Sequence, residues 1–128
     1  MRLLLDTHAL LWWLNKSPSL TISALSLLKN RDTTVLISTA SVWEIATKVR
    51  LGKLDAETEV LQNFVFYLDR EHFQTVPITA EHGIRAGSLP GPHKDPFDRM
   101  LIAQALTENI PIVSNDKALD GYGVTRLW

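Results

Sequence analysis

Short apolar blocks alternate with amphipathic blocks along the whole chain. The blocks at 2–5 and 34–38 have an almost unbroken run of large apolar residues, a pattern typical of strands that are buried on both faces. Further strands are predicted at 73–78, 110–114 and 124–128, and Pro77 limits the first of these to a sheet edge or to its last residues. Apolar residues at helical spacing predict helices at 9–14, 19–29, 42–51, 55–70, 79–86 and 98–107, with a short turn of helix at 117–119.

Strands that alternate with helices predict a parallel sheet whose strands are joined by right-handed crossovers. The chain of 128 residues is close to the commonest domain size, and it contains no internal repeat, linker or low-complexity segment. We therefore expect one α/β domain over residues 1–128.

Composition narrows the range of chemistry. The formal net charge of −1 gives no overall basic field, which weakens a nucleic-acid hypothesis without removing it. The absence of cysteine excludes disulfides, thiolate catalysis and cysteine-ligated zinc, and it suits a reducing compartment. Asp6 comes too early for a signal peptide, and no apolar run is long enough to span a membrane. We expect a cytoplasmic protein with no membrane partner.

The acidic residues follow the predicted strands in a consistent way. Asp6 directly follows the first strand, Asp116 follows the fourth, and Glu44 lies in the first turn of the helix after the second. Asp95 and Asp98 lie where a proline-containing loop enters a helix. Because the carboxyl ends of parallel strands meet at one edge of a sheet, where ligands bind, we expect these carboxylates to gather there.

Each acid also has an ordinary structural explanation. An aspartate that precedes a helix accepts hydrogen bonds from its free N–H groups, so every aspartate of this set could be a helix cap. Glu44 could complete an S-x-x-E capping box with Ser41, and Thr39 is another candidate cap for the same helix.

Taken together, four or five carboxylates at one edge would repel each other unless a cation is bound. Oxygen ligands favour Mg²⁺ or Mn²⁺, whereas the four histidines are scattered and show no zinc-binding spacing. The usual chemistry of such a cluster is phosphoryl transfer, in which the metal activates water and stabilises the leaving oxygen.

Four segments of the chain resemble the PIN-domain ribonucleases, and specifically the VapC-like toxins of bacterial toxin–antitoxin modules. The segments are LLLDTH at 3–8, STASVWEI at 38–45, HKDPFDRMLIAQA at 93–105 and IVSND at 112–116. Their order and spacing together are specific, and the resemblance spans nearly the whole chain.

The resemblance implies a three-layer α/β/α sandwich around a parallel sheet of four to five strands, in the order 3-2-1-4-5. It implies metal-dependent endonucleolytic cleavage of RNA, with growth arrest as the consequence. Such toxins usually form dimers and are held inactive by a cognate antitoxin whose C-terminal segment covers the acidic site. Carried over by position, Asp6, Glu44, Asp98 and Asp116 match the acidic quartet of the family, and Asp95 is a fifth acid, an outer group or the helix cap.

Our hypothesis is that Asp6, Asp98 and Asp116 hold the metal, directly or through water, while Glu44 binds a second metal or positions the attacking water. Three small polar neighbours could bind the waters of the metal or orient the acids, with turn and cap chemistry as the alternative: Thr7, Ser114 and Asn115.

Cations and aromatic residues near the acids are candidate RNA contacts. The substrate-binding candidates are Lys48, His93, Lys94, Arg99 and Lys117. As alternatives, Lys48 could pair with Glu44 four residues earlier, Arg99 could pair with an acid, and His93 could order its loop. Base stacking is a role for three tryptophans, although their apolar neighbours favour core packing or a protein interface: Trp12, Trp13 and Trp43.

The same acids would also serve a DNA nuclease or a metal-dependent phosphatase. A catalytically silent α/β binding module, of receiver-like or nucleotide-binding type, is an alternative from another class. The nucleotide-binding version is disfavoured because no glycine-rich phosphate loop follows the first strand.

Overall fold

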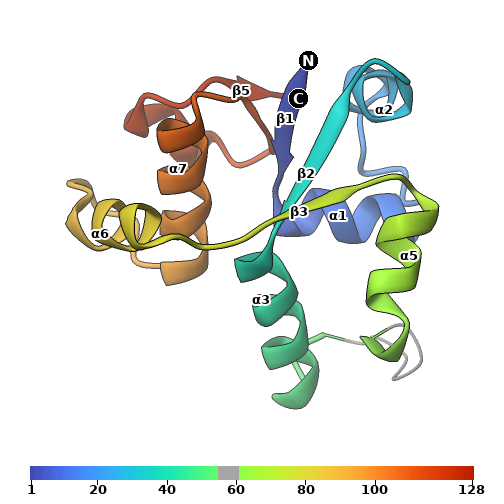
Figure 1. Cartoon of the computed structure of the whole chain (residues 1–128), viewed down its shortest axis with the longest axis horizontal. Helices are drawn as coiled ribbons and strands as arrows, with labels where there is room; N and C mark the ends of the chain where they lie inside the picture. Colours follow the sequence, from blue (N-terminus) through green and yellow to red (C-terminus); the bar gives the residue numbers. More distant parts are fainter. Residues whose placement is uncertain (55–60) are drawn as a thin grey trace.

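A parallel five-stranded sheet in the order β3-β2-β1-β4-β5 forms the centre of the computed structural model, which describes residues 1–54 and 61–128 (Figure 1). Every neighbouring pair of strands is parallel. The strands are β1 (Arg2–Leu5), β2 (Thr34–Ser38), β3 (Gln74–Val76), β4 (Ile112–Val113) and β5 (Arg126–Leu127). The predicted fold class and strand order are therefore confirmed, and Pro77 follows an edge strand as expected.

The central strand β1 is buried on both faces, as its uninterrupted apolar sequence predicted. Leu3 and Leu5 belong to one apolar cluster and Leu4 to another, because alternate residues of a strand point to opposite faces. All three leucine side chains are fully buried. In the sheet, Leu5 lies beside Ile37 of β2 and Val113 of β4, so the residues that follow these three strands share one edge.

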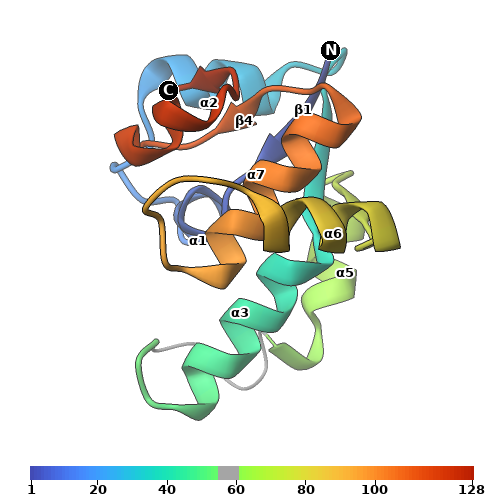
Figure 2. The same cartoon turned by 90° about the vertical axis from the view of Figure 1, so that its left-hand side faces the viewer.

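Helices cover both faces of the sheet and complete three layers (Figures 1 and 2). The cluster around Leu3 and Leu5 includes residues of α1 (Thr7–Leu14), α2 (Ile22–Lys29), α3 (Thr39–Arg50) and α5 (Phe64–Arg70). The cluster around Leu4 includes residues of α7 (Pro96–Glu108) and of the 3₁₀ helix η1 (Lys117–Tyr122), and α6 (Ala80–Ser88) packs on α7.

Several helix starts differ from those that the sequence predicted. Helix α3 begins at Thr39 with Ser38 as its N-cap, whose hydroxyl accepts a hydrogen bond from the Ala40 N–H at 3.0 Å. The predicted Ser41–Glu44 capping box is therefore wrong, since both residues lie inside the helix. The strand ends at Ser38 as predicted, and this last serine is itself the cap, so the helix begins one residue before a cap at Thr39 and three residues before a cap at Ser41 would allow.

Helices α2 and α7 also begin elsewhere than expected. Helix α2 begins at Ile22, not at residue 19, because Thr21 caps it. Helix α7 begins at Pro96, a residue suited to a first helical turn, so Asp98 lies inside that turn. Of the helix predicted at 55–70, residues 55–60 lie outside the described residues, and α5 accounts for its last part. None of the described helices has the length and apolar character needed to cross a membrane.

Candidate active site

The first acid of the site, Asp6, is fixed where β1 turns into α1. It caps the helix, and its Oδ1 accepts a hydrogen bond from the Ala9 N–H at 2.7 Å. The side chain of Ser114, which follows β4, forms a second hydrogen bond with this carboxylate. Asp6 is only 7% exposed, and burial is the main reason why its pKa is raised, with the charge of Asp116 adding to the effect.

The two acids of the proline-containing loop have different roles in the structure. Asp95 is the N-cap of α7, and its Oδ1 accepts hydrogen bonds from the N–H groups of Phe97 at 2.8 Å and Asp98 at 3.2 Å. Of the three roles that the sequence left open for Asp95, the structure shows that of the helix cap. Asp98 lies in the first turn of the helix, and its Oδ2 lies 3.2 Å from His93 Nε2.

Glu44 enters from α3 and is almost completely buried. Its Oε2 forms an ion pair with Lys48 Nζ at 2.6 Å, as the i,i+4 alternative predicted. Its Oε1 is buried without a hydrogen-bond partner among the described residues. A buried carboxylate oxygen with no partner is costly, and a bound cation or water would remove that cost.

The negative charges of neighbouring carboxylates raise the pKa of Asp98 and of Asp6. The pKa of Asp98 is raised to about 6, first by burial and then by the charge of Asp95, with smaller contributions from Glu44 and Asp6; only His93 opposes the shift. The carboxylates of Asp6 after β1, Glu44 on α3 and Asp98 on α7 are therefore close enough to affect one another electrostatically.

Asp116 completes the group from the segment after β4. It caps η1 by accepting a hydrogen bond from the Ala118 N–H at 3.0 Å, and its Oδ2 lies 3.7 Å from His93 Nε2. Single donor atoms of His93, Asp98 and Asp116 lie within 4.8 Å of one another, a separation that a metal ion could bridge. The sequence offered His93 as a substrate contact or as a residue that orders its loop, although its place two residues before Asp95 was a signal for the acidic cluster.

The donor set fits a hard divalent cation. Oxygen ligands prevail, the acids repel one another, and one buried oxygen of Glu44 lacks a partner. Asp6, Asp98 and Asp116 would hold such an ion, with Glu44 at its side. Of the small polar neighbours, Ser114 is buried and accepts a hydrogen bond from the Asp116 N–H at 3.0 Å.

The other two small polar neighbours, Thr7 and Asn115, differ in their surroundings. The Thr7 hydroxyl donates to Ser41 Oγ at 2.9 Å and thereby joins α1 to α3, whereas Asn115 is exposed. Thr7 is thus placed to hold two walls of the site together.

The predicted cationic contacts separate into two groups. Lys94 and Lys117 are exposed, so their ammonium groups are accessible to a phosphate. Arg99 instead donates to the carbonyls of Ala86, Leu89 and His93. The sequence suggested a phosphate or an acid as its partner, and the structure shows three carbonyls of the preceding helix and loop.

The three candidate tryptophans differ in how far they are buried. Trp12 packs on Trp128 and Trp13 on Phe73, both at 5.7 Å between ring centroids, and both partly buried indoles pack against the apolar cluster around Leu3 and Leu5. Trp43 is 64% exposed. Core packing is therefore confirmed for the first two, whereas Trp43 remains available for a ligand or a partner.

Residues 3–124 match the PIN domain family. The chain belongs to the PIN domain family. PIN domains are nucleases that generally depend on divalent metal ions, which agrees with an acidic cluster at the strand ends. No curated protein sequence matches the chain significantly.

Several solved structures share this PIN fold over nearly their full length. VapBC2 from Rickettsia felis, bound to a DNA fragment from its promoter, aligns over 99% of this chain and 98% of its own with a TM-score of 0.72 and 19% identity. VapBC-1 from nontypeable Haemophilus influenzae aligns over 99% and 97% with a TM-score of 0.71 and 14% identity. A toxin–antitoxin complex from Klebsiella pneumoniae aligns over 98% and 95% with a TM-score of 0.67 and 16% identity.

Proposed function

We propose that this PIN domain is a cytoplasmic, metal-dependent endoribonuclease and the toxin of a toxin–antitoxin pair. The observation that carries the proposal is the convergence of Asp6, Glu44, Asp98 and Asp116 from four segments on one sheet edge, with a raised pKa for the two most buried aspartates. The similarity in fold to toxins in solved toxin–antitoxin complexes supports the toxin role.

Mg²⁺ or Mn²⁺ is the proposed cofactor, held by Asp6, Asp98 and Asp116, with Glu44 at a second ion or at the attacking water. When bound, such an ion lowers the pKa of water and stabilises the charge that develops at phosphorus and on the leaving oxygen. The chain orients these ligands by fixing Asp6 and Asp116 at helix N-termini, where backbone N–H groups hold one oxygen of each. Lys94 and Lys117 are the exposed cations proposed to contact the RNA backbone.

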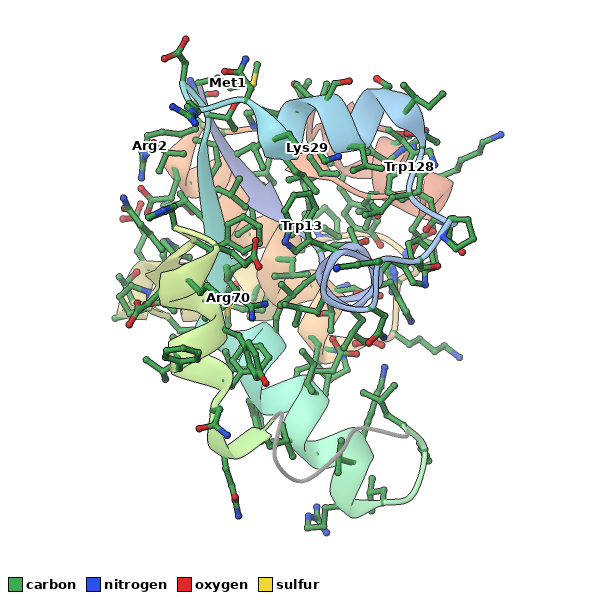
Figure 3. All side chains as sticks on the ribbon, turned by 90° about the vertical axis from the view of Figure 1, so that its right-hand side faces the viewer. Met1, Arg2, Trp13, Lys29, Arg70 and Trp128 are labelled. Carbon is green, nitrogen blue, oxygen red and sulfur yellow. The ribbon has the colours of Figure 1, made fainter. Side chains whose placement is uncertain are left out.

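An antitoxin is the proposed protein partner. A groove of about 370 Å³ between α1, α2 and the end of α5 offers it an apolar floor, and its rim carries Lys16 and Lys29 together with Arg70, which is paired with Glu71. The floor includes Trp13 and Leu20, and Lys29 and Arg70 lie around it (Figure 3). An amphipathic segment with acidic residues would fit this groove.

A homodimer is the second proposed assembly. Trp43 and Ile84 are exposed by 64% and 72% on α3 and α6, and such large apolar side chains favour contact with a second copy. Light scattering of the purified chain tests this assembly directly, and a monomer at all accessible concentrations would contradict it.

Cleavage assays separate the proposed RNase from the other enzymes that the same acids would serve. The purified chain is incubated with single-stranded RNA, with DNA and with a phosphomonoester, each in Mg²⁺, in Mn²⁺ and in EDTA. We expect cleavage of RNA alone, lost in EDTA and in Asp6→Asn and Asp98→Asn. Asp32→Asn is the matched control, because Asp32 lies in an exposed turn before the N-terminal end of β2, whereas the acids lie at the opposite edge of the sheet. Full RNase activity in Asp98→Asn, or hydrolysis of the phosphomonoester alone, would overturn the proposal.

A further inference from the structure

We infer that His93 is a positioning residue of this site, whose Nε2–H holds the carboxylates of Asp98 and Asp116 in place for a cation, and that it is not itself a ligand. The inference rests on the proposed function, because it concerns the same metal site. It differs from the roles that the sequence offered for His93, which were contact with RNA and ordering of the loop.

The hydrogen bonds of the imidazole define which nitrogen carries the proton. The Asp95 N–H donates to His93 Nδ1 at 3.3 Å, so Nδ1 offers its lone pair there. In a neutral imidazole the proton is then on Nε2, the nitrogen that lies 3.2 Å from Asp98 Oδ2. A nitrogen that carries a proton has no lone pair for a metal, so the arrangement suits a hydrogen-bond donor and not a ligand.

His93 Nε2 lies close to carboxylates from two separate segments of the chain. Asp98 belongs to α7 and Asp116 follows β4, and Nε2 lies 3.7 Å from the Oδ2 of the second carboxylate. The first distance is that of a hydrogen bond and the second that of an electrostatic contact. His93 therefore sets the separation of two acids that would otherwise repel each other, and it leaves Asp98 Oδ1 for a cation.

The loop that carries His93 is held from both sides. From η1, the Tyr122 hydroxyl accepts a hydrogen bond from the His93 N–H at 2.7 Å. From α7, Arg99 Nη1 donates to the His93 carbonyl at 3.0 Å and Nη2 donates to the Leu89 carbonyl. The His93 side chain is only 16% exposed, so its ring is confined between the two acids. These contacts give Arg99 its role in the site, which is to support the loop.

Titration of the apoprotein with Mn²⁺ alone, followed by the EPR signal of the free ion, tests this inference without any RNA. His93→Gln keeps an N–H donor close to the position of Nε2, and we expect it to keep Mn²⁺ affinity within about threefold of the original chain. His93→Leu removes the donor at similar volume, and we expect its affinity to fall about tenfold or more, as for other outer-shell partners of metal ligands. Equal losses in the two variants would overturn the inference, since a ligand role or a purely structural role predicts that pattern.

Pulsed EPR of Mn²⁺ bound to the unaltered chain gives a test that needs no variant. We expect no strong nitrogen coupling of the kind that a directly bound imidazole produces, and its presence would overturn the inference. Tyr122→Phe removes the hydroxyl that holds the loop and leaves the imidazole intact, and we expect a smaller loss of Mn²⁺ affinity than in His93→Leu. An unchanged affinity in both Tyr122→Phe and His93→Leu would also contradict the inference.

The two proposals fail in different ways. A chain that binds Mn²⁺ through Asp98, shows rescue by His93→Gln and cleaves no RNA would overturn the proposed function and leave the role of His93 intact. A chain that cleaves RNA and shows direct nitrogen coupling would support the proposed function and overturn the positioning role of His93. A chain that binds no Mn²⁺ would overturn the role of His93.

Discussion

Trp43 packs edge-on against Phe97, with 4.9 Å between the ring centroids and 75° between the ring planes. Each of these aromatic residues immediately precedes an acid of the site, Glu44 on α3 and Asp98 on α7. The pair therefore ties together the two helices that carry these acids, outside the buried core.

A double-mutant cycle measures this tie. We expect Trp43→Ala and Phe97→Ala to show a coupling energy of about 1 kcal/mol in the free energy of unfolding, as for other edge-to-face aromatic pairs. Chemical denaturation of the two single variants and the double variant provides the number. Trp43→Ala combined with Phe66→Ala is the control, because Phe66 is an exposed aromatic residue on α5 that makes its ring contact with Tyr67. Additive effects of Trp43→Ala and Phe97→Ala would show that the rings do not stabilise each other.

The pKa of Asp98 predicts how cleavage depends on pH. Asp98 is ionised above its pKa of about 6 and binds a cation only in that form, so we expect activity at limiting metal to fall tenfold per pH unit below about 6. Saturating metal stabilises the ionised form, and the midpoint should then move to lower pH. Initial cleavage rates at two Mn²⁺ concentrations between pH 4.5 and 8 test both statements. A midpoint that does not move with metal would assign the pH dependence to another group.

The same carboxyl should destabilise the metal-free fold at neutral pH. Its folded pKa of about 6 exceeds the ordinary value of 3.8, so the folded state binds the proton more tightly than the unfolded chain. The ionised form therefore costs stability, and this cost builds up between pH 4 and pH 6 and is complete above them.

Asp98→Asn should remove that cost. We expect it to raise the free energy of unfolding by about 1–2 kcal/mol at pH 7.5 in EDTA, after allowance for solvent screening, and to change it little below pH 4. Added Mn²⁺ should stabilise the original chain and not the variant. Thermal unfolding at the two pH values, with and without metal, measures all three quantities. Destabilisation by Asp98→Asn at pH 7.5 in EDTA would contradict the assignment.

Lys48 should be needed for stability because of Glu44. The Lys48 ammonium donates a hydrogen bond to the buried Glu44 Oε2 at 2.6 Å, and this hydrogen bond raises the pKa of Lys48 and keeps the ammonium charged. We expect Lys48→Met to lower the free energy of unfolding by about 2 kcal/mol, since it leaves a buried carboxylate without a counter-charge. Glu44→Gln in the same chain should restore most of the loss. If urea denaturation shows that the losses in the free energy of unfolding caused by Lys48→Met and Glu44→Gln simply add, the ion pair is not the cause of the lost stability.

Gly91 should tolerate no side chain. Its φ is +110°, and a Cβ there would lie 2.7 Å from the ring of Tyr122, which holds the His93 loop. We expect Gly91→Ala to lower the free energy of unfolding by about 2 kcal/mol and to weaken Mn²⁺ binding. The matched control is Gly83→Ala, within α6, where a Cβ meets nothing within 4 Å and helix propensity predicts a gain of about 0.5–1 kcal/mol. Similar losses in the two variants would contradict the importance of the close approach.

The sheet and the place of the acids could be predicted from the sequence because burial leaves an unambiguous pattern. Leu3–Leu5 and the β-branched run at 34–38 have no polar face, and an acid or a serine ends each. The position of Asp6 at a strand end followed from that pattern. The strand order was implied by the family resemblance, because no local pattern fixes which strands are neighbours.

Other features depend on tertiary structure and left no local signal. Ser38, Thr39 and Ser41 are all competent caps, and only the end of β2 selects the first. The carbonyl partners of Arg99 depend on the path of the loop at 89–93, which propensity does not define. The contact between His93 and Asp116 joins residues from separate segments, so no spacing rule could reveal it.

Three aspartates of this chain, at 6, 95 and 116, accept hydrogen bonds from the first N–H groups of a helix. Asparagine accepts the same hydrogen bonds nearly as well, but it carries no charge for a cation. Under the proposed function, a single-base change in the codon of Asp6 or Asp116 would therefore produce a chain that is inactive but still folded, with its groove intact. Under the proposed toxin role, such chains would still occupy the proposed antitoxin and would thereby release active copies.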